Sequence, residues 1–433
     1  MNNSDNFNLD LITFLDASPT PFHAVQNMVE KLTSVGFKKL DESDEWALNK
    51  KGKYFVVRND SSICAFILGS NKLTANGIRM VGAHTDSPCL KVKPNPEYKK
   101  QGCYQLGVEV YGGALLNPWF DRDLSIAGRV SYLDDKDVIQ QVLVDFKTAV
   151  ATVPSLAIHL DRDANKKRFI NPQKHLPPII MHAAGEGVPF EFRELLSQQL
   201  LKQHQACSVA RVLDYDLSLY DTQNSSLLGF DKKFIAGARL DNLLSCFIGL
   251  QSLLEAGADN TCVLICNDHE EVGSVSAMGA QGSFLKSVLE RLASGSETMT
   301  RMIDQSMLLS LDNAHAVHPN YSDKHDEHHG PLLNQGPVIK INANQRYASN
   351  DVSSALFRQL CAKQNVPVQT FVIRSDMGCG STIGPITAAQ LGIKTLDVGV
   401  PTLGMHSIRE LAGSDDAYFL FEAVSAFNKI KTL

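Results

Sequence analysis

The first part of the chain combines an amphipathic helical pattern with short apolar runs. Thr20 and Pro21 are typical of the first residues of a helix, and apolar residues then recur at helical spacing until Gly36. Three apolar runs of strand length follow, at 54–57, 63–68 and 78–82. The last run leads into the string AHTDS, so His84 and Asp86 lie just beyond a predicted strand.

The middle of the chain has a different pattern. From about residue 92 the sequence contains KVKPNP, the pair Gly112-Gly113, short alternating runs at 128–132 and 138–144, and the proline-rich HLPPII. Alternation over short runs between glycine and proline signals is typical of antiparallel strands. We therefore predict a mainly β insertion that ends near Gly237.

After this insertion, strand-like and helix-like segments alternate again. The predicted strands are 262–266, 307–311, 338–341, 368–373 and 394–398. The predicted helices are 240–254, 351–362 with Asn350 as its cap, 381–391, and a closing helix from about Asp415, where Asp415 and Asp416 offset the helix dipole. This alternation predicts an α/β fold with a mainly parallel mixed sheet flanked by helices.

Composition excludes several classes of function. The chain has 433 residues, 44% of them hydrophobic and 20% charged, and this length is enough for two or three globular domains. The net charge is −6 and no basic run stands out, which argues against a nucleic-acid partner. No apolar stretch is long enough to span a membrane, and the N-terminus has no basic, apolar leader. Nine cysteines, an odd number, favour reduced thiols and a cytoplasmic protein.

Several histidine and acidic residues follow predicted strands or begin helices. They are His84, Asp86, Asp241, Glu270, Glu271, Asp312 and His406. Each one alone is more often a surface residue than a ligand. Together, nitrogen and carboxylate ligands without cysteine suit zinc, and their number provides enough charge for two ions. Because Glu270, Glu271 and Asp312 directly follow apolar strands, we expect them to point into one crevice.

Nine strings extend this pattern over nearly the whole chain. They are SPTPFHAV, GAHTDSPCLKVKP, GGALLNPWFDRDLSIAGRV, ARLDNL, DHEEVGS, DNAHAVHPNYSDKHD, NQRYAS, GSTIGP and GMHSIRE. In content and order they resemble the signature blocks of the aspartyl aminopeptidase family of co-catalytic zinc peptidases. The resemblance implies a zinc exopeptidase-like fold and hydrolysis of the N-terminal residue, preferably Asp or Glu, from peptides.

The resemblance also implies a ligand set. One zinc ion is held by His84, Asp241 and Asp312, while Asp241 bridges to a second ion held by Glu271 and His406. Cobalt or manganese can take similar ligands. Glu270 is the implied general base, which takes a proton from the attacking water and passes it to the leaving amine. Asp86 can accept the second N–H group of the His84 imidazole and fix its tautomer.

Substrate recognition and assembly are further implications of the resemblance. Lys340 matches the position that faces the acidic side chain of the substrate, and His315 and His329 are possible substrate contacts in a polar loop. His159, otherwise a histidine at a strand end, would reach into the active site of a neighbouring subunit. Partners are then peptides with a free N-terminus and further copies of the chain, as dimers in a tetrahedral dodecamer.

The order of the motifs predicts the domain arrangement. Because His84 precedes the β insertion and the other ligands follow it, the catalytic domain comprises 1–92 and 237–433, and 93–236 form an inserted domain for dimerisation or access. Two alternatives to the acidic aminopeptidase stay open. One is an enzyme of different specificity: a broad or neutral-residue aminopeptidase, a carboxypeptidase or a deacylase. The other is a non-catalytic, zinc-stabilised peptide-binding assembly protein.

Overall fold

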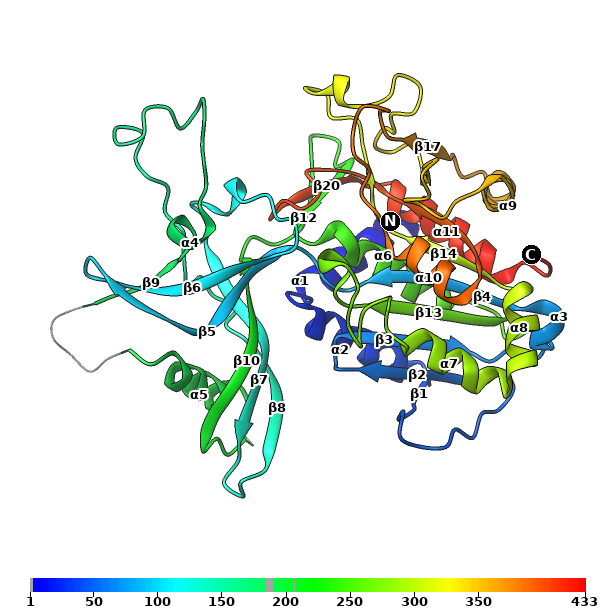
Figure 1. Ribbon diagram of the computed structural model, residues 1–433, viewed down its shortest axis with the longest axis horizontal. Coiled ribbons are helices and arrows are strands. Elements are labelled where there is room, and N and C mark those ends of the chain that lie inside the picture. The colour runs from blue at the N-terminus through cyan, green and yellow to red at the C-terminus, as the bar shows by residue number, and fades with distance from the viewer. Residues whose placement is uncertain (1–2, 184–189, 206) are drawn as a thin grey trace. The chain divides into compact units, whose positions relative to one another are not determined.

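The computed structural model describes residues 3–183, 190–205 and 207–433. The chain forms two compact units (Figure 1). The first unit comprises Met1–Ser87, Ser225–Met405 and Glu410–Leu433, and the second comprises Pro88–Asn224 and His406–Arg409. The first unit thus takes in residues 225–236, which the sequence pattern assigned to the insertion. They belong to it because β12 (Phe234–Gly237) pairs with β20 (Glu410–Gly413).

The first unit contains a nine-stranded mixed sheet. In spatial order its strands are β1 (Lys38–Lys39), β2 (Lys53–Arg58), β3 (Ser62–Ile67), β13 (Thr261–Asn267), β4 (Ile78–His84), β14 (Met307–Leu311), β18 (Lys394–Gly399), β16 (Val338–Ile341) and β17 (Gln369–Val372). The central strands β13, β4, β14 and β18 run parallel to one another. The structure confirms the predicted fold class and the position of each predicted strand in this unit.

Helices cover both faces of this sheet because its strands are apolar on both sides. On one face, strand residues such as Leu264 and Leu309 pack against a first layer of helices. This layer consists of α1 (Asn3–Asp16), α2 (Pro21–Ser34), α6 (Leu240–Leu254), α9 (Asp351–Gln364) and α11 (Asp416–Lys429). On the other face, alternate residues such as Val263 and Leu308 pack against α7 (Phe284–Ala293) and α8 (Ser296–Asp304), and α10 (Ile383–Leu391) lies on the same side.

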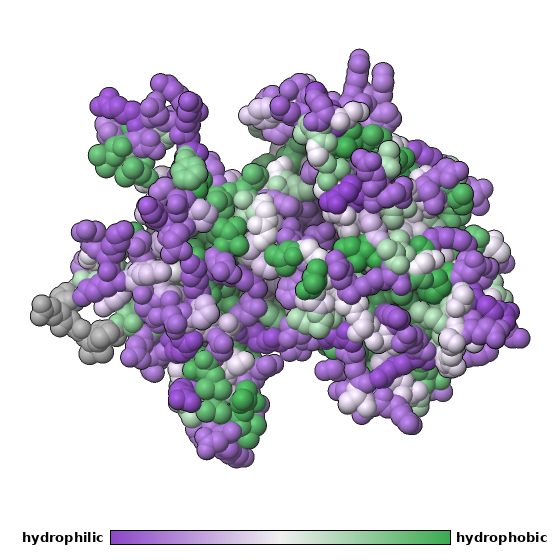
Figure 2. Space-filling model, in the orientation of Figure 1, coloured by the Kyte–Doolittle hydropathy of each residue, from purple (hydrophilic) through white to green (hydrophobic). Residues whose placement is uncertain are grey.

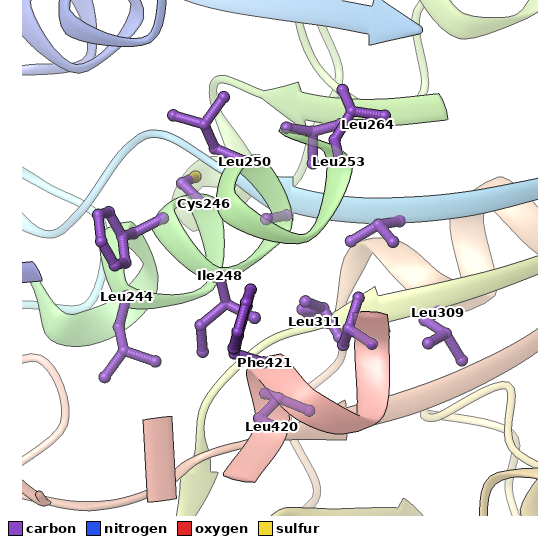
Figure 3. Packing of buried hydrophobic residues seen from close by; sticks show 14 of the residues in the cluster. Leu244, Cys246, Ile248, Leu250, Leu253, Leu264, Leu309, Leu311, Leu420 and Phe421 are labelled. Carbon is purple, nitrogen blue, oxygen red and sulfur yellow. The ribbon is translucent and has the colours of Figure 1, made fainter. Parts of the chain in front are cut away.

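Helix α6 is the central element of the first layer. Figure 3 shows its apolar side chains, among them Leu250 and Leu253, beside Leu264 of β13 and above Leu420 and Phe421 of α11. The residues in this cluster are almost fully buried. Because its packing fixes α6 against the sheet, the first residues of this helix are held at one end of the central strands.

The structure confirms several local features that the sequence predicts. The Asn350 side chain accepts a hydrogen bond from Ser353 N–H at 2.9 Å, so α9 begins with the predicted cap. All nine cysteines lie in the described part of the chain and are free thiols, as predicted. The helix α1 was not predicted, because its apolar residues follow no clear start signal.

A smaller five-stranded sheet completes the first unit. Its strands, in spatial order, are β11 (Ser226–Leu228), β12, β20, β19 (Pro401–Leu403) and β15 (Ala314–His315). Strand β12 lies four residues before Asp241 in the sequence. Its pairing places Gly237 opposite Glu410, so this sheet brings two distant parts of the chain together near the start of α6.

The second unit is built on a six-stranded antiparallel sheet. The strands are β8 (Ile139–Asp145), β7 (Leu124–Leu133), β10 (Arg211–Asp221), β5 (Cys89–Lys100), β6 (Cys103–Tyr111) and β9 (Ile179–His182). Helix α5 (Phe192–Gln203) packs on it through Leu196 and Leu200. The short helix α4 (Pro172–His175) also belongs to this unit.

The surface differs from these cores. Figure 2 shows that the visible face is mostly hydrophilic, with smaller hydrophobic areas between the polar side chains. Within the described residues, no helix has the length and apolar character needed to cross a membrane.

Candidate active site

Three neighbouring strands deliver polar side chains to one edge of the large sheet. His84 is the last residue of β4, Asp312 follows β14, and Glu270 and Glu271 lie in a short 3-10 turn after β13. Strands β13, β4 and β14 are adjacent and parallel, so their carboxyl ends meet at the same edge. Open α/β sheets bind ligands at this edge. The structure therefore brings these four side chains together as the sequence pattern predicted.

Asp241 reaches the same place from the start of α6. Its backbone is not helical (φ −84°, ψ 105°), and Arg239 before it is left-handed with φ 60°. The Asp241 carboxylate is buried, with one oxygen 3.4 Å from Nε2 of His84. The non-helical start of α6 thus turns an acidic side chain toward the strand ends.

His84 is the centre of the cluster. Its Nε2 atom lies 3.4 Å from Oδ1 of Asp241 and 3.7 Å from Oδ1 of Asp312. Ligand atoms of His84, Asp241 and Asp312 all lie within 4.8 Å of one another, and so do those of His84, Glu270 and Glu271. The three residues of each group are therefore close enough together to bind one metal ion.

Asp86 connects His84 with the loop that carries the two glutamates. The Nδ1 atom of His84 is 3.1 Å from the Asp86 carbonyl oxygen and 3.4 Å from its carboxylate. The carboxylate also accepts hydrogen bonds from the backbone N–H groups of Glu270 at 3.1 Å and Glu271 at 3.0 Å. Asp86 is buried and therefore holds both the imidazole and the glutamate turn in fixed positions.

The pKa values of the glutamates reflect an excess of negative charge. Burial raises the pKa of Glu270 to about 8, and the carboxylates of Asp312, Asp86 and Asp241 raise it as well, while His84 acts in the opposite direction. Burial and the charge of Asp241 raise the pKa of Glu271 to about 10. Buried carboxylates resist ionisation unless cations compensate them. The site therefore favours the binding of positive charge.

Lys340 supplies one cation from strand β16. Its Nζ atom lies 3.2 Å from Oδ2 of Asp312, donates to the Asn313 carbonyl oxygen at 3.0 Å, and lies 5.1 Å from the centre of the Tyr347 ring. Burial alone would raise the pKa of Asp312, but Lys340 and His84 hold it well below its usual value. Only 2% of Lys340 is exposed, so its ammonium group is buried and not solvated.

The donor set fits zinc. Imidazole nitrogen and carboxylate oxygen are usual zinc ligands, at about 2.0–2.2 Å. Two ligands of a tetrahedral ion at such distances are roughly 3.4 Å apart, close to the separations of His84 Nε2 from Asp241 and Asp312. The second nitrogen of His84 faces Asp86, as is usual for a zinc-bound histidine.

The other histidines predicted for the site make the following contacts within their own units. His406 belongs to the segment grouped with the second unit, where its Nδ1 atom lies 3.1 Å from the Gly113 carbonyl oxygen. His159 lies in an exposed turn of the second unit. His315 is exposed and contacts the edge of the Phe371 ring, and His329 pairs with Asp326 at 2.6 Å. The loop around His329 is not helical, as predicted.

Two residues at the site were missed in the sequence. Ser87 donates a hydrogen bond to the Asp241 carbonyl oxygen at 2.6 Å. The buried Glu410 carboxylate accepts one from Asp241 N–H at 2.9 Å. Both residues lie inside strings that carried the resemblance, GAHTDSPCLKVKP and GMHSIRE. The only signal was their position a few residues after the predicted ligands His84 and His406 in the sequence.

A doubly covered α/β sheet with a buried cluster of one histidine and several carboxylates at its strand ends is suited to a metal ion that activates water, as in metal-dependent hydrolases. Comparison with known families agrees with this class. Residues 14–428 match the family described as "Aminopeptidase I zinc metalloprotease (M18)". The chain belongs to the M18 family, the aspartyl aminopeptidase family, and is a zinc metallo-aminopeptidase.

Individual relatives match over nearly their full length. A probable M18 family aminopeptidase 2 of Pseudomonas putida is 58% identical over 429 residues, which are 99% of each chain. A protein of the same description from Pseudomonas syringae pv. tomato is 57% identical over 98% of each chain.

Solved structures show the same fold. Ape4, in a complex with Nbr1, superimposes with a TM-score of 0.94 at 38% identity over 98% of this chain and 85% of that one. The mApe1 dodecamer of S. cerevesiae gives a TM-score of 0.84 at 29% identity over 99% and 96% of the two chains.

Proposed function

We propose that the enzyme removes the N-terminal residue from peptides, with a preference for Asp or Glu, and that it uses two zinc ions. The observation that supports this most is the buried cluster at the ends of β13, β4 and β14. It gathers five carboxylates around His84, those of Asp86, Asp241, Glu270, Glu271 and Asp312. Their negative charge exceeds the positive charge that the cationic side chains of the site can supply. Such a cluster suits two divalent cations bridged by one carboxylate.

The ligands divide into two sets in this proposal. His84, Asp241 and Asp312 hold one ion, and their mutual distances support this grouping. Asp241 also serves the second ion, together with Glu271 and His406. The position of His406 in the chain, four residues before the buried Glu410, is compatible with this role. Cobalt or manganese would be accepted by the same nitrogen and oxygen ligands.

The bound ions would polarise the scissile carbonyl and lower the pKa of a water molecule. Glu270 acts as the general base, takes a proton from the attacking water, and donates it to the leaving amine. Burial and the neighbouring carboxylates raise the pKa of Glu270 to about 8, and the bound cations would lower it again, so that Glu270 is ionised as a general base must be. The remaining carboxylates favour the α-ammonium group of a peptide, as an aminopeptidase requires.

Lys340 provides the preference for acidic N-terminal residues. An ammonium group has three N–H donors. Two of them are directed at Asp312 and at the Asn313 carbonyl, which leaves one for a substrate carboxylate. The low exposure of Lys340 means that a substrate side chain must enter the site to reach it, where its charge interacts strongly with an anion.

The substitution Lys340→Met distinguishes this specificity role from a role in which Lys340 only compensates the charge of Asp312. Methionine is similar in length and removes the charge. We expect kcat/KM for peptides with N-terminal Asp and Glu to fall at least about tenfold more than for N-terminal Leu and Ala, a difference of about 1.4 kcal/mol. Equal losses on all four substrates would contradict the specificity role, and a wild-type enzyme fastest on Leu would favour the neutral-residue alternative.

We also propose that the second unit serves assembly. The turn with His159 contains the exposed apolar side chains of Leu156, Ile158 and Leu160, and Phe169 near it is 81% exposed. Exposed apolar groups of this size usually mark an interaction surface. Since a relative, mApe1, forms a dodecamer, we assign this turn to contacts between subunits. In a tetrahedral dodecamer of dimers, His159 would help to stabilise the reaction intermediate in a neighbouring subunit.

A further inference from the structure

The backbone of Asp241 needs outside support. An amide N–H at the start of a helix has no partner in the preceding turn, and a buried N–H without an acceptor is costly. Asp241 has non-helical φ and ψ and is 3% exposed. Its orientation therefore depends on groups outside α6.

Two side chains provide this support from other parts of the first unit. Ser87 donates to the Asp241 carbonyl oxygen at 2.6 Å, and Oε2 of Glu410 accepts from Asp241 N–H at 2.9 Å. Glu410 is only 3% exposed. It is the first residue of strand β20, where it pairs with Gly237 of β12. Its position is thus fixed by the five-stranded sheet and not by α6.

A carboxylate at this position is otherwise unfavourable. Glu410 adds a buried negative group close to Asp241, in a region that already contains Glu271 and Asp312. Burial of a carboxylate is costly unless hydrogen bonds and cations compensate it. The hydrogen bond to Asp241 N–H and the positive end of α6 provide part of this compensation.

We propose that Glu410 is a positioning residue of the metal centre: its hydrogen bond holds Asp241 in the backbone conformation that presents the bridging carboxylate to both ions. This inference rests on the proposed dinuclear site. Asp241 is the one ligand proposed for both ions, so a shift of its backbone disturbs both. Groups that orient metal ligands typically change metal affinity by about 10–100-fold when they are removed.

Two substitutions separate the hydrogen bond from the charge. Glu410→Gln keeps an acceptor at the same reach and removes the charge, whereas Glu410→Asp keeps the charge but withdraws the acceptor by roughly 1.5 Å. A matched control is Asp416→Ala, because Asp416 is also a buried carboxylate that accepts backbone N–H groups, at Asn334 and Gly336. It has no part in the proposed site.

The measurement is zinc affinity and stoichiometry, by competition with a chromophoric chelator and by metal analysis of the full chain. We expect two zinc ions in the wild type and in Asp416→Ala, Glu410→Gln within about threefold of wild-type affinity, and Glu410→Asp weaker by about 10–100-fold. Wild-type affinity in Glu410→Asp, or equal losses in both Glu410 variants, would overturn the positioning role alone. A wild type that binds no zinc would overturn the proposed function as well.

Discussion

The buried carboxylate of Asp416 and the carboxylate cluster of the active site, both in the first unit, differ in how their negative charge is compensated. Asp416, at the start of α11, is fully buried, and its two oxygens accept backbone N–H groups of Asn334 at 2.6 Å and Gly336 at 2.8 Å. In the active site, Glu270 is surrounded by Asp312, Asp86 and Asp241, and each of them raises its pKa. The first carboxylate is satisfied by the protein itself, whereas the second group requires added cations.

This comparison separates structural from functional acids. Burial raises the pKa of Asp416 to about 7, against the opposing effect of its N–H donors. That carboxylate stabilises a loop before β16 and has no reason to bind a metal. The active-site carboxylates lie at the ends of three parallel strands, where a ligand can enter. Burial alone therefore does not mark a site, but several buried carboxylates around one imidazole do.

The largest expected effect comes from the two adjacent glutamates. Both have oxygens near His84, and we assign the base to Glu270 and the ligand to Glu271. Glu270→Gln is expected to lower kcat by about 10²–10⁴-fold and to retain two zinc ions, because only a proton acceptor is lost. Glu271→Gln, the matched control, is expected to lose one zinc ion. Metal analysis beside kcat checks this, and the opposite pattern of zinc loss would exchange the two assignments.

A smaller effect is expected at Asp86. In the wild type, Glu270 N–H and Glu271 N–H each donate to a different oxygen of Asp86. The substitution Asp86→Asn replaces one of these oxygens with an N–H₂ group, which cannot accept, so one of the two N–H groups loses its partner. The Asp86 carbonyl still faces His84, so the imidazole keeps part of its support. We expect a loss of about 10–100-fold in zinc affinity or in kcat/KM. Unchanged zinc binding together with unchanged kcat/KM would show that the glutamate turn is held by other contacts.

The smallest effect on activity is expected at Asp416. Its pKa is about 7 in the folded protein, whereas an unperturbed aspartate has a pKa of 3.8, so its stabilising contribution is complete below pH 4 and is lost as the pH rises through 7. Asp416→Asn does not titrate. The stability of the wild type relative to this variant should fall between pH 5 and pH 8, by up to about 3 kcal/mol.

Urea denaturation of both proteins in excess chelator measures this difference without a contribution from bound metal. The variant should keep wild-type zinc binding and kcat/KM at pH 7. If the difference in stability between the wild type and Asp416→Asn is the same at pH 5 and at pH 8, Asp416 does not change its protonation in this range. A loss of zinc would remove the distinction between the two groups of carboxylates.

The sequence predicted which residues form the site better than it predicted the contacts that hold them in place. His84, Asp312 and the two glutamates follow strong apolar strands, and the rule for strand ends in α/β sheets was enough to group them. The cap at Asn350 was predicted from local chemistry, and the structure confirms it. These features depend on residues that are neighbours in the sequence.

The remaining features depend on contacts between distant residues. Asp416 was expected only to offset a helix dipole, but it binds a loop that lies more than 75 residues earlier. Glu410 meets Asp241 across 169 residues of sequence. The resemblance pointed to Lys340, but its ion pair with Asp312 depends on the place of β16 in the sheet. Local patterns cannot predict such pairs, because the sheet order that creates them is not visible in any one segment.

The most direct test of the account removes the cations. Wild-type enzyme is stripped with a chelator, zinc is returned in steps, and hydrolysis of peptides with N-terminal Asp, Glu, Leu or Ala is followed at each step. We expect no hydrolysis in the stripped enzyme, full activity only as the second equivalent of zinc binds, and the highest kcat/KM for Asp or Glu. Full hydrolysis by the stripped enzyme would contradict the claim that the carboxylate cluster works by binding metal ions.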